Sequence, residues 1–204
     1  MSTPQLPIVS DLRVDALTLS RGGRVLVRDL SFALKPGDAL ILAGANGSGK
    51  TTLLKAIAGL VRPDSGMISA PACSYLGHAD GLKASETVLE VLRFWAGMDA
   101  SAAPDDDAAR IDDIASALGV RPLYLTPCRH LSAGQKRRVA LARMALKRDA
   151  GLWLMDEPAA PLDIQGKALL AELVAGFRQR GGMVIAATHA DLGWKDTQFA
   201  EVGA

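Results

Sequence analysis

Apolar and polar residues alternate in the N-terminal part of the chain, and this period of two predicts half-buried strands. One such stretch runs from Val14 to Leu19, and a second includes Leu30, Phe32 and Leu34. Gly22-Gly23 lies between the two stretches and marks a turn. We therefore expect two neighbouring strands at the start of the fold.

A continuous apolar run over residues 39–43 indicates a strand that is buried on both faces of a parallel sheet. Pro36-Gly37 forms the turn before this strand, because proline presets one backbone dihedral and glycine accepts a positive one. Residues 50–60 are expected to form a helix. A loop over 62–66 and two short strands ending by Leu76 should follow.

The pattern changes from strand to helix in the middle of the chain. Thr87 and Glu90 have the spacing of a capping box, which predicts a helix start. The apolar residues that recur at helical spacing just after Thr87 are Val88, Val91, Leu92 and Trp95.

Strand patterns return at 152–155 and 183–187, with a helical apolar stripe over 169–177 between them. Strands that alternate with helices around an inserted helical region predict an α/β fold. We expect one domain over residues 1–204, with a helical subdomain inserted at about 80–145.

The strongest motif in the chain is a glycine-rich loop over residues 44–51. It reads Gly-Ala-Asn-Gly-Ser-Gly-Lys-Thr, fits G-x-x-x-x-G-K-[ST], and lies between a buried strand and a helix. Backbone N–H groups of such a loop cradle phosphates, Lys50 reaches the β- and γ-phosphates, and Thr51 holds Mg²⁺. We therefore predict ATP and Mg²⁺ as ligands, with Lys50 also acting in catalysis. The nucleotide-binding residues expected here are Gly44, Ala45, Asn46, Gly47, Ser48, Gly49, Lys50, Thr51 and Thr52.

Two acidic residues follow the second buried strand, which ends at Met155. Ligands of parallel sheets bind beyond the carboxyl ends of the strands, so Asp156 is expected to lie near the metal ion. Glu157 is then placed to orient or deprotonate an attacking water.

The segment Leu131-Ser-Ala-Gly-Gln135 resembles the signature of the ATP-binding-cassette (ABC) family. The family usually has glycine where Ala133 stands. The resemblance covers the chain from about Leu12 to about Leu192. It implies a P-loop NTPase cassette with a RecA-like core, an antiparallel β subdomain and a helical subdomain. It also implies a head-to-tail homodimer, in which Ser132 and Gly134 complete the ATP site of the second cassette.

Further positions match or depart from the family pattern. Residues 161–163 resemble the loop that contacts the partner cassette, and His189 resembles the histidine that senses the γ-phosphate and is expected to be catalytic. The usual aromatic residue that stacks on adenine is absent, and Arg21 could stack there instead. Gly77-His78 replaces the usual glutamine between the lobes. His78 either links the metal site to the transport partner or is an ordinary loop histidine.

Three segments, 75–83, 131–138 and 181–192, resemble the ATP-binding subunits of the haem exporters of cytochrome c maturation. This implies a peripheral protein on the cytoplasmic side of the cell inner membrane, bound to integral membrane subunits. No direct haem binding is expected, because the three histidines, His78, His130 and His189, are otherwise accounted for. Two alternatives remain open: another small ABC transport ATPase, and a soluble ABC switch ATPase of DNA repair or translation.

Composition and charge argue against several other classes of protein. The formal net charge of +1 gives no reason to expect nucleic acid as a partner. The basic run 129–148 is interpreted as a solvated helix face. Residues 1–11 lack signal-peptide features, and no apolar run reaches the roughly 20 residues of a membrane-spanning helix. Cys73 and Cys128 match no metal-ligand spacing and are expected to be reduced thiols.

Overall fold

The computed structural model of the chain describes residues 11–98 and 104–203. An antiparallel sheet with the order β2-β1-β4 forms from β1 (Leu12–Arg21), β2 (Arg24–Leu34) and β4 (Ser65–Ser69). The apolar positions of β1 change phase after Val14, and the register of both its neighbours shifts there. Ala16, with a φ of 48°, absorbs the extra residue, so that Leu17 and Leu19 stay buried.

A second, parallel sheet carries the site. Its order is β5-β6-β7-β3-β8, and its strands are β5 (Cys73–Leu76), β6 (Leu152–Asp156), β7 (Met183–Ala187), β3 (Ala39–Ala43) and β8 (Thr197–Glu201). Every pairing within this sheet is parallel. The carboxyl ends of β6, β7 and β3 therefore lie side by side at one edge, where ligands of such sheets bind.

The two faces of the parallel sheet pack into two separate apolar cores. Leu152 and Leu154 contribute to one core with α1 (Lys50–Ile57) and the antiparallel sheet. Trp153 and Met155, which point the other way, contribute to the second core with α5 (Ile164–Gln179). Burial on both faces explains why these strands are continuously apolar.

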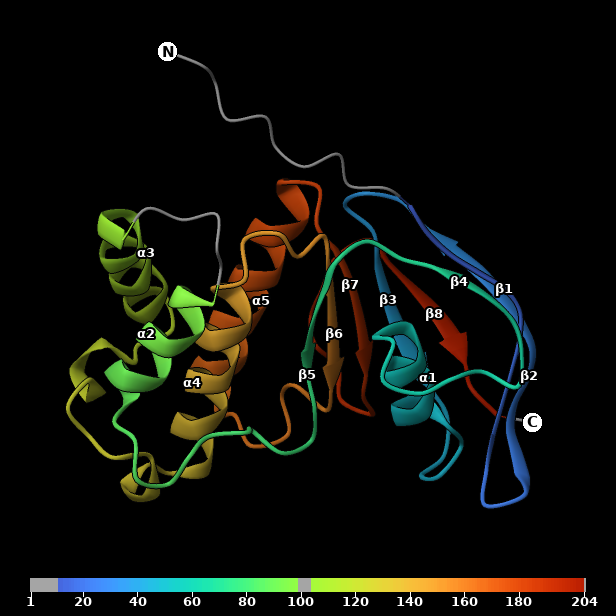
Figure 1. The fold of residues 1–204 in the computed structure, drawn as a ribbon, viewed down its shortest axis with the longest axis horizontal. Coiled ribbons are helices and arrows are strands. Elements are labelled where there is room, and N and C mark those ends of the chain that lie inside the picture. Colours follow the sequence, from blue (N-terminus) through green and yellow to red (C-terminus); the bar gives the residue numbers. More distant parts are fainter. Residues whose placement is uncertain (1–10, 99–103, 204) are drawn as a thin grey trace, which may run out of the picture.

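Helices make up the segment between β5 and β6. They are α2 (Val88–Gly97), α3 (Pro104–Ala117), η1 (Arg121–Leu123), η2 (Cys128–His130) and α4 (Ala133–Ala145). Figure 1 shows α2, α3 and α4 grouped on the left and the antiparallel sheet on the right, with the parallel sheet between them. Capping boxes at Thr87 and Ser132 begin α2 and α4, so both helix starts are specified by local sequence.

The predicted α/β fold is confirmed, with four local differences. The helix expected over 50–60 ends at Ile57, and Ser65 and Gly66 belong to β4 rather than to a loop. Trp95 is 37% exposed, unlike Val88, Val91 and Leu92, which are buried. The edge strand β8 was not expected from the sequence. Within the described ranges, no helix is both long enough and apolar enough to cross a bilayer.

Candidate nucleotide-binding site

The glycine-rich loop leads into α1 with its backbone donors free. Gly49 precedes the helix with a φ of 110° and has no side chain that could cap it. The first N–H groups of α1 therefore have no side-chain acceptor at the N-cap position. Ser48 Oγ is buried and has no hydrogen-bond partner among the described residues. Free N–H groups at a helix start and an unsatisfied buried hydroxyl fit a bound phosphate.

The loop is also held against the end of the chain. A Cβ atom at Gly44 would lie 2.4 Å from the backbone oxygen of Val202, and the φ of Gly44 is 134°. Val202 N donates to Ala43 O over 2.8 Å, directly before the loop. Only glycine fits at position 44, because any side chain would collide with backbone rather than with a movable side chain.

Lys50 is buried, and its ammonium group bonds within the site. Nζ donates to the backbone oxygens of Gly44 and Ala45 and lies 3.3 Å from Nε2 of His189. The same Nε2 lies 3.1 Å from Oδ1 of Asn46. One ring nitrogen cannot accept from Lys50 and donate to Asn46 at once, so the tautomer of His189 selects between these two contacts.

A hydroxyl and a carboxylate oxygen meet beside the loop. Thr51 Oγ1 donates to Oδ2 of Asp156 over 2.8 Å, and Asp156 is buried at the end of β6. Oxygen ligands of this kind are the ones that Mg²⁺ prefers. Burial, reinforced by the nearby Asp156 carboxylate, raises the pKa of Tyr75 to about 12.

Glu157 adopts an unusual backbone conformation directly after β6. Its φ is 47°, in the left-handed region, which costs a non-glycine residue about 1–2 kcal/mol. Its N–H donates to Ala187 O over 2.8 Å, and Thr188 Oγ1 donates to its Oε2 over 3.0 Å. The carboxylate is therefore held from the end of β7 and is directed away from the strand that precedes it.

Arg137 in α4 was not among the predicted site residues, yet it contacts this segment directly. It is 2% exposed, and its guanidinium donates to the backbone oxygens of Asp156, Glu157 and Pro158. The interpretation of the basic run as a solvated face is therefore wrong at this position. Arg137 shares a helical stripe with the buried Leu141 and Met144, a spacing that could have revealed it.

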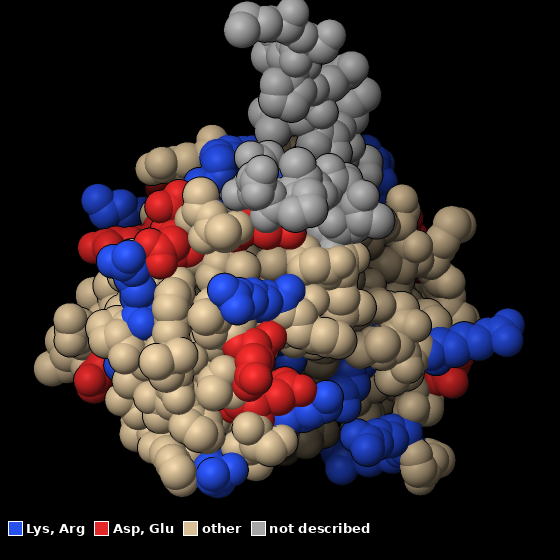
Figure 2. Space-filling view, turned by 60° about the vertical axis from the view of Figure 1, so that its left-hand side comes forward, with Lys and Arg blue, Asp and Glu red and all other residues tan. Residues whose placement is uncertain are grey.

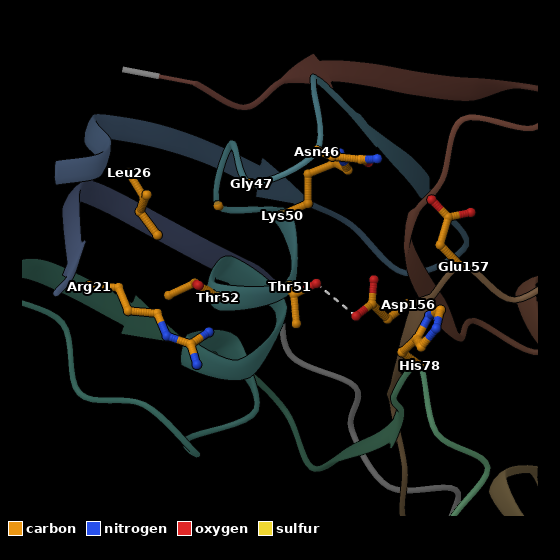
Figure 3. Close-up of a pocket in the computed structure, with 11 residues that line it drawn as sticks. Arg21, Leu26, Asn46, Gly47, Lys50, Thr51, Thr52, His78, Asp156 and Glu157 are labelled. Atoms are coloured by element: carbon orange, nitrogen blue, oxygen red, sulfur yellow. Dashed lines mark hydrogen bonds between the residues drawn. The ribbon is translucent and has the colours of Figure 1, made fainter. Parts of the chain in front are cut away.

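Most of the predicted residues line one cavity of about 570 Å³. Figure 3 shows Arg21 and Leu26 at one end of it, and His78, Asp156 and Glu157 at the other. The residues that line it are Arg21, Leu26, Asn46, Gly47, Gly49, Lys50, Thr51, Thr52, His78, Asp156 and Glu157. A volume of this size suits a small-molecule ligand.

The signature residues lie apart from the phosphate loop. Ser132 is exposed and forms the N-cap of α4 through Gln135, while Gly134 packs against Pro161, whose oxygen would be 3.0 Å from an added Cβ. Ala133, next to them, lines a second cavity of about 350 Å³, to which His78 and Glu157 also contribute. Within one chain, therefore, the signature does not join the cavity formed by the phosphate loop.

Asp163 has a local structural role. Its Oδ1 accepts a hydrogen bond from Gly166 N over 2.7 Å, which caps the start of α5. Contact of residues 161–163 with a partner cassette stays a prediction.

The chain matches the ABC transporter family over residues 27–160. It is 46% identical to the cytochrome c biogenesis ATP-binding export protein CcmA of Maricaulis maris, across 98% of this chain and 97% of that protein. It is 41% identical to the protein of the same name from Hyphomonas neptunium, across 97% of each chain.

The fold agrees with this assignment. A solved structure of an ATP-binding subunit of an ABC transporter superposes with a TM-score of 0.85 at 23% identity, over 95% of this chain and 86% of that one. The phosphate loop, the Thr51–Asp156 pair and the signature all fall within or beside the matched range. The chain belongs to the ABC transporter family, as an ATP-binding subunit similar to the CcmA proteins.

Proposed function

We propose that this chain is the ATP-hydrolysing subunit of an ABC transporter, and that this transporter is the haem exporter complex of cytochrome c biogenesis. One observation carries the first part: a single cavity gathers the phosphate loop, the Thr51–Asp156 pair and Glu157. The names of the relatives, cytochrome c biogenesis export proteins, support the second part.

The backbone of the phosphate loop and Lys50 bind the ATP phosphates in this proposal. The ammonium of Lys50 is bonded to neutral loop carbonyls, and a phosphate offers it a charged acceptor, which forms the stronger hydrogen bond. Ser48 Oγ gains in a phosphate oxygen the partner that it lacks among the described residues. Residues 44–52 thus hold the ATP phosphates through many donors and one fixed positive charge.

Thr51 and Asp156 fit a magnesium ion. Within the described residues, no group of three or more His, Cys, Asp and Glu side chains could enclose a metal. Mg²⁺ does not require such a group, because it keeps several waters and takes one or two protein ligands plus substrate phosphates. When bound, it supplies positive charge to the β- and γ-phosphate oxygens.

Glu157 is the general base in this proposal, and His189 holds the γ-phosphate and the water in line. The hydrogen bond from Thr188 leaves the other carboxylate oxygen of Glu157, Oε1, available to accept a proton from water. His189 is exposed beside Lys50, at the carboxyl end of β7, where it can reach the terminal phosphate.

The far end of the cavity takes the nucleotide base. Arg21 and Leu26 lie there, and the guanidinium plane of Arg21 can stack on adenine in place of an aromatic ring. An aliphatic side chain and a guanidinium read the face of a base rather than its hydrogen-bonding edge.

A second cassette completes the site. Ser132 and Ala133 at the start of α4 are exposed, and their helix N-terminus is therefore accessible to an anion from outside this chain. In a head-to-tail homodimer, the backbone around Ser132 and Gly134 contacts the γ-phosphate bound by the other chain.

Integral membrane subunits bind the side of α2, on the cytoplasmic face of the inner membrane. Phe94, Met98 and Leu125 are large apolar residues exposed on or near this helix. Basic and acidic side chains are interspersed on the face shown in Figure 2, which does not favour nucleic acid as a partner. The stretch from His78 to Trp95 is the docking region for a cytoplasmic helix of the partner.

Co-purification from solubilised inner membrane, with mass spectrometry of the bound proteins, tests the transporter assignment. We expect integral membrane subunits of cytochrome c biogenesis to be recovered with the chain. Recovery of a different transporter would refute the haem-exporter part alone. Co-purification with ribosomes or DNA and without membrane subunits would refute the transporter assignment altogether.

A photo-crosslinking residue at Phe94 tests the docking region. Position 94 should capture a membrane subunit, whereas the same residue at the equally exposed Met67 in β4 should not. Capture from position 67 and not from 94 would move the interface to the antiparallel sheet.

A further inference from the structure

We propose that Arg137 is a positioning residue for ATP hydrolysis: it holds the backbone of Glu157 in its left-handed conformation and couples that conformation to helix α4. This inference rests on the proposed role of Glu157 as the base. Arg137 has no role in the nucleotide site as proposed above.

The contacts of Arg137 use every donor of its guanidinium. Nε donates to Pro158 O over 3.1 Å, and Nη2 donates to the oxygens of Asp156 and Glu157 over 2.6 and 2.8 Å. Nη1 donates to Gly77 O over 2.9 Å and to Oδ1 of Asp80 over 3.1 Å. The five N–H groups are therefore satisfied, as a side chain that is only 2% exposed requires.

Three of these acceptors are consecutive carbonyls around Glu157, the residue with a φ of 47°. A residue stays in the left-handed region only where its surroundings stabilise it. Here the rigid, forked guanidinium of Arg137 bonds to the carbonyl groups of Glu157 and of both its neighbours. The orientation of the Glu157 carboxylate follows from this backbone conformation. Without the fork, Glu157 could relax to the ordinary right-handed or extended region and aim its side chain elsewhere.

The remaining two acceptors lie in the loop after β5. Asp80 provides the charge that compensates Arg137, and Gly77 lies at the carboxyl end of β5. Arg137 itself belongs to α4, whose first residues carry the signature. One side chain thus connects α4, the loop after β5 and the backbone of Glu157. A shift of α4 would therefore move the backbone of Glu157 as well.

The chain offers a matched control in Arg178. This arginine donates to the backbone oxygens of Gly37, Lys195 and Asp196 over 2.7–2.9 Å. Asp196 is likewise left-handed, with a φ of 48°. These contacts lie just before β3 and β8, at the amino ends of the strands, whereas the phosphate loop lies at the carboxyl ends. Arg178 therefore has the same kind of structural role without a catalytic residue beside it.

The experiment compares Arg137→Lys with Arg178→Lys in the full-length chain, measuring kcat, ATP affinity and the thermal midpoint of each. A lysine keeps the charge but cannot form the fork. Arg137→Lys should lower kcat about 10- to 100-fold, since small misplacements of catalytic groups have effects of this size, while ATP affinity changes less than about twofold. Arg178→Lys should leave kcat within about twofold, even at a similar loss of thermal stability. Equal effects of the two variants on kcat would overturn the proposal.

A second comparison asks whether Arg137 acts through Glu157. In a Glu157→Gln background, Arg137→Lys should not lower the residual rate further, because the group that it positions is gone. A further fall as large as in the parental chain would overturn the proposal. Parental turnover of Glu157→Gln alone would instead refute the base itself, so the two failures are distinguishable.

If Arg137→Lys does not fold, Asp80→Asn provides the test. This change leaves the fork in place and removes only its charged partner from the inter-lobe loop. A several-fold lower kcat with unchanged ATP affinity would support the proposal, and parental kcat would overturn it.

Discussion

The hydroxyl of Thr188 donates a hydrogen bond to Oε2 of Glu157 over 3.0 Å, linking the first residue after β7 to the first residue after β6. The same hydroxyl accepts a bond from Ala190 N over 3.0 Å. The carboxylate is therefore oriented by a neighbouring strand end, and one of its oxygens is left for other chemistry. This geometry leads to a direct prediction for catalysis.

Replacing the carboxylate at Glu157 should separate hydrolysis from binding. Glu157→Gln keeps the shape but loses the basicity, and turnover should fall about 100-fold or more while ATP affinity stays near normal. His189→Ala should also reduce turnover more than binding. Thr188→Val, which removes only the orienting hydroxyl, should produce a smaller loss. Steady-state ATPase assays and equilibrium binding test this, and parental turnover of Glu157→Gln would remove Glu157 from the mechanism.

Lys50 should control binding rather than the fold. Lys50→Ala removes the charge that meets the β- and γ-phosphates, so productive ATP binding should be lost. Lys55→Ala, in the last turn of the same helix, is the matched control and should bind ATP normally. Fluorescent-nucleotide titration measures both. Unchanged affinity in Lys50→Ala would contradict the assignment of the phosphate loop.

The two capping boxes allow stability and function to be compared directly. Ser132→Ala and Thr87→Ala each remove an N-cap side chain, and each should lower the free energy of unfolding by about 1 kcal/mol. Ser132→Ala should in addition weaken ATP-dependent pairing of two chains and reduce turnover, because its helix start serves the second cassette. Chemical denaturation, analytical ultracentrifugation and ATPase assays give the three readouts. If both variants lost turnover equally, the signature would have no role beyond starting α4.

The two tyrosines should ionise at unusually high pH. Burial is the main cause that raises the pKa of Tyr75 and of Tyr124 to about 12. Because the folded-state pKa exceeds the unfolded value of about 10, the stabilisation from these residues is complete below pH 10. It is lost as the pH rises from about 10 towards 12. Ultraviolet titration of tyrosinate checks this cleanly, since the chain has 2 tyrosines, and a transition centred near pH 10 in the folded protein would contradict it.

Strands that are buried on both faces were predictable from the sequence, because continuous apolar runs have few other interpretations. The strands β3, β6 and β7 are of this kind, and their expected positions agree with the structure. The edge strand β8 was missed for the opposite reason. None of its residues is buried and Phe199 is exposed, so neither an alternating nor a continuous apolar pattern marks it. Its pairing to β3 depends on backbone hydrogen bonds, which leave little trace in sequence.

The residues of the site likewise divide into some that the sequence predicts and some that it does not. The phosphate loop is contiguous in sequence, so its residues could be identified from one motif. Thr188 and Arg137 contact Glu157 across 31 and 20 residues of chain, and Arg137 contacts Asp80 across 57 residues. Contacts of that range depend on how α4 and β7 pack, and no local pattern encodes them. The helical spacing of Arg137 with Leu141 and Met144 is compatible with burial, but it does not say which groups the guanidinium binds.

The close approach of Gly44 to the carbonyl of Val202 gives the edge strand an importance that its exposed side chains do not suggest. A strand without a buried face specifies its pairing register only weakly, and none of the residues of β8 is buried. Here a one-residue insertion within 197–202 would replace the Val202 carbonyl by a neighbouring group of opposite orientation and would take away the Ala43–Val202 bond that ends β3. Nucleotide affinity should consequently respond to the length of β8, although this strand contributes no side chain to the cavity of about 570 Å³. Engineered insertions near β8 would therefore change ATP binding from a distance.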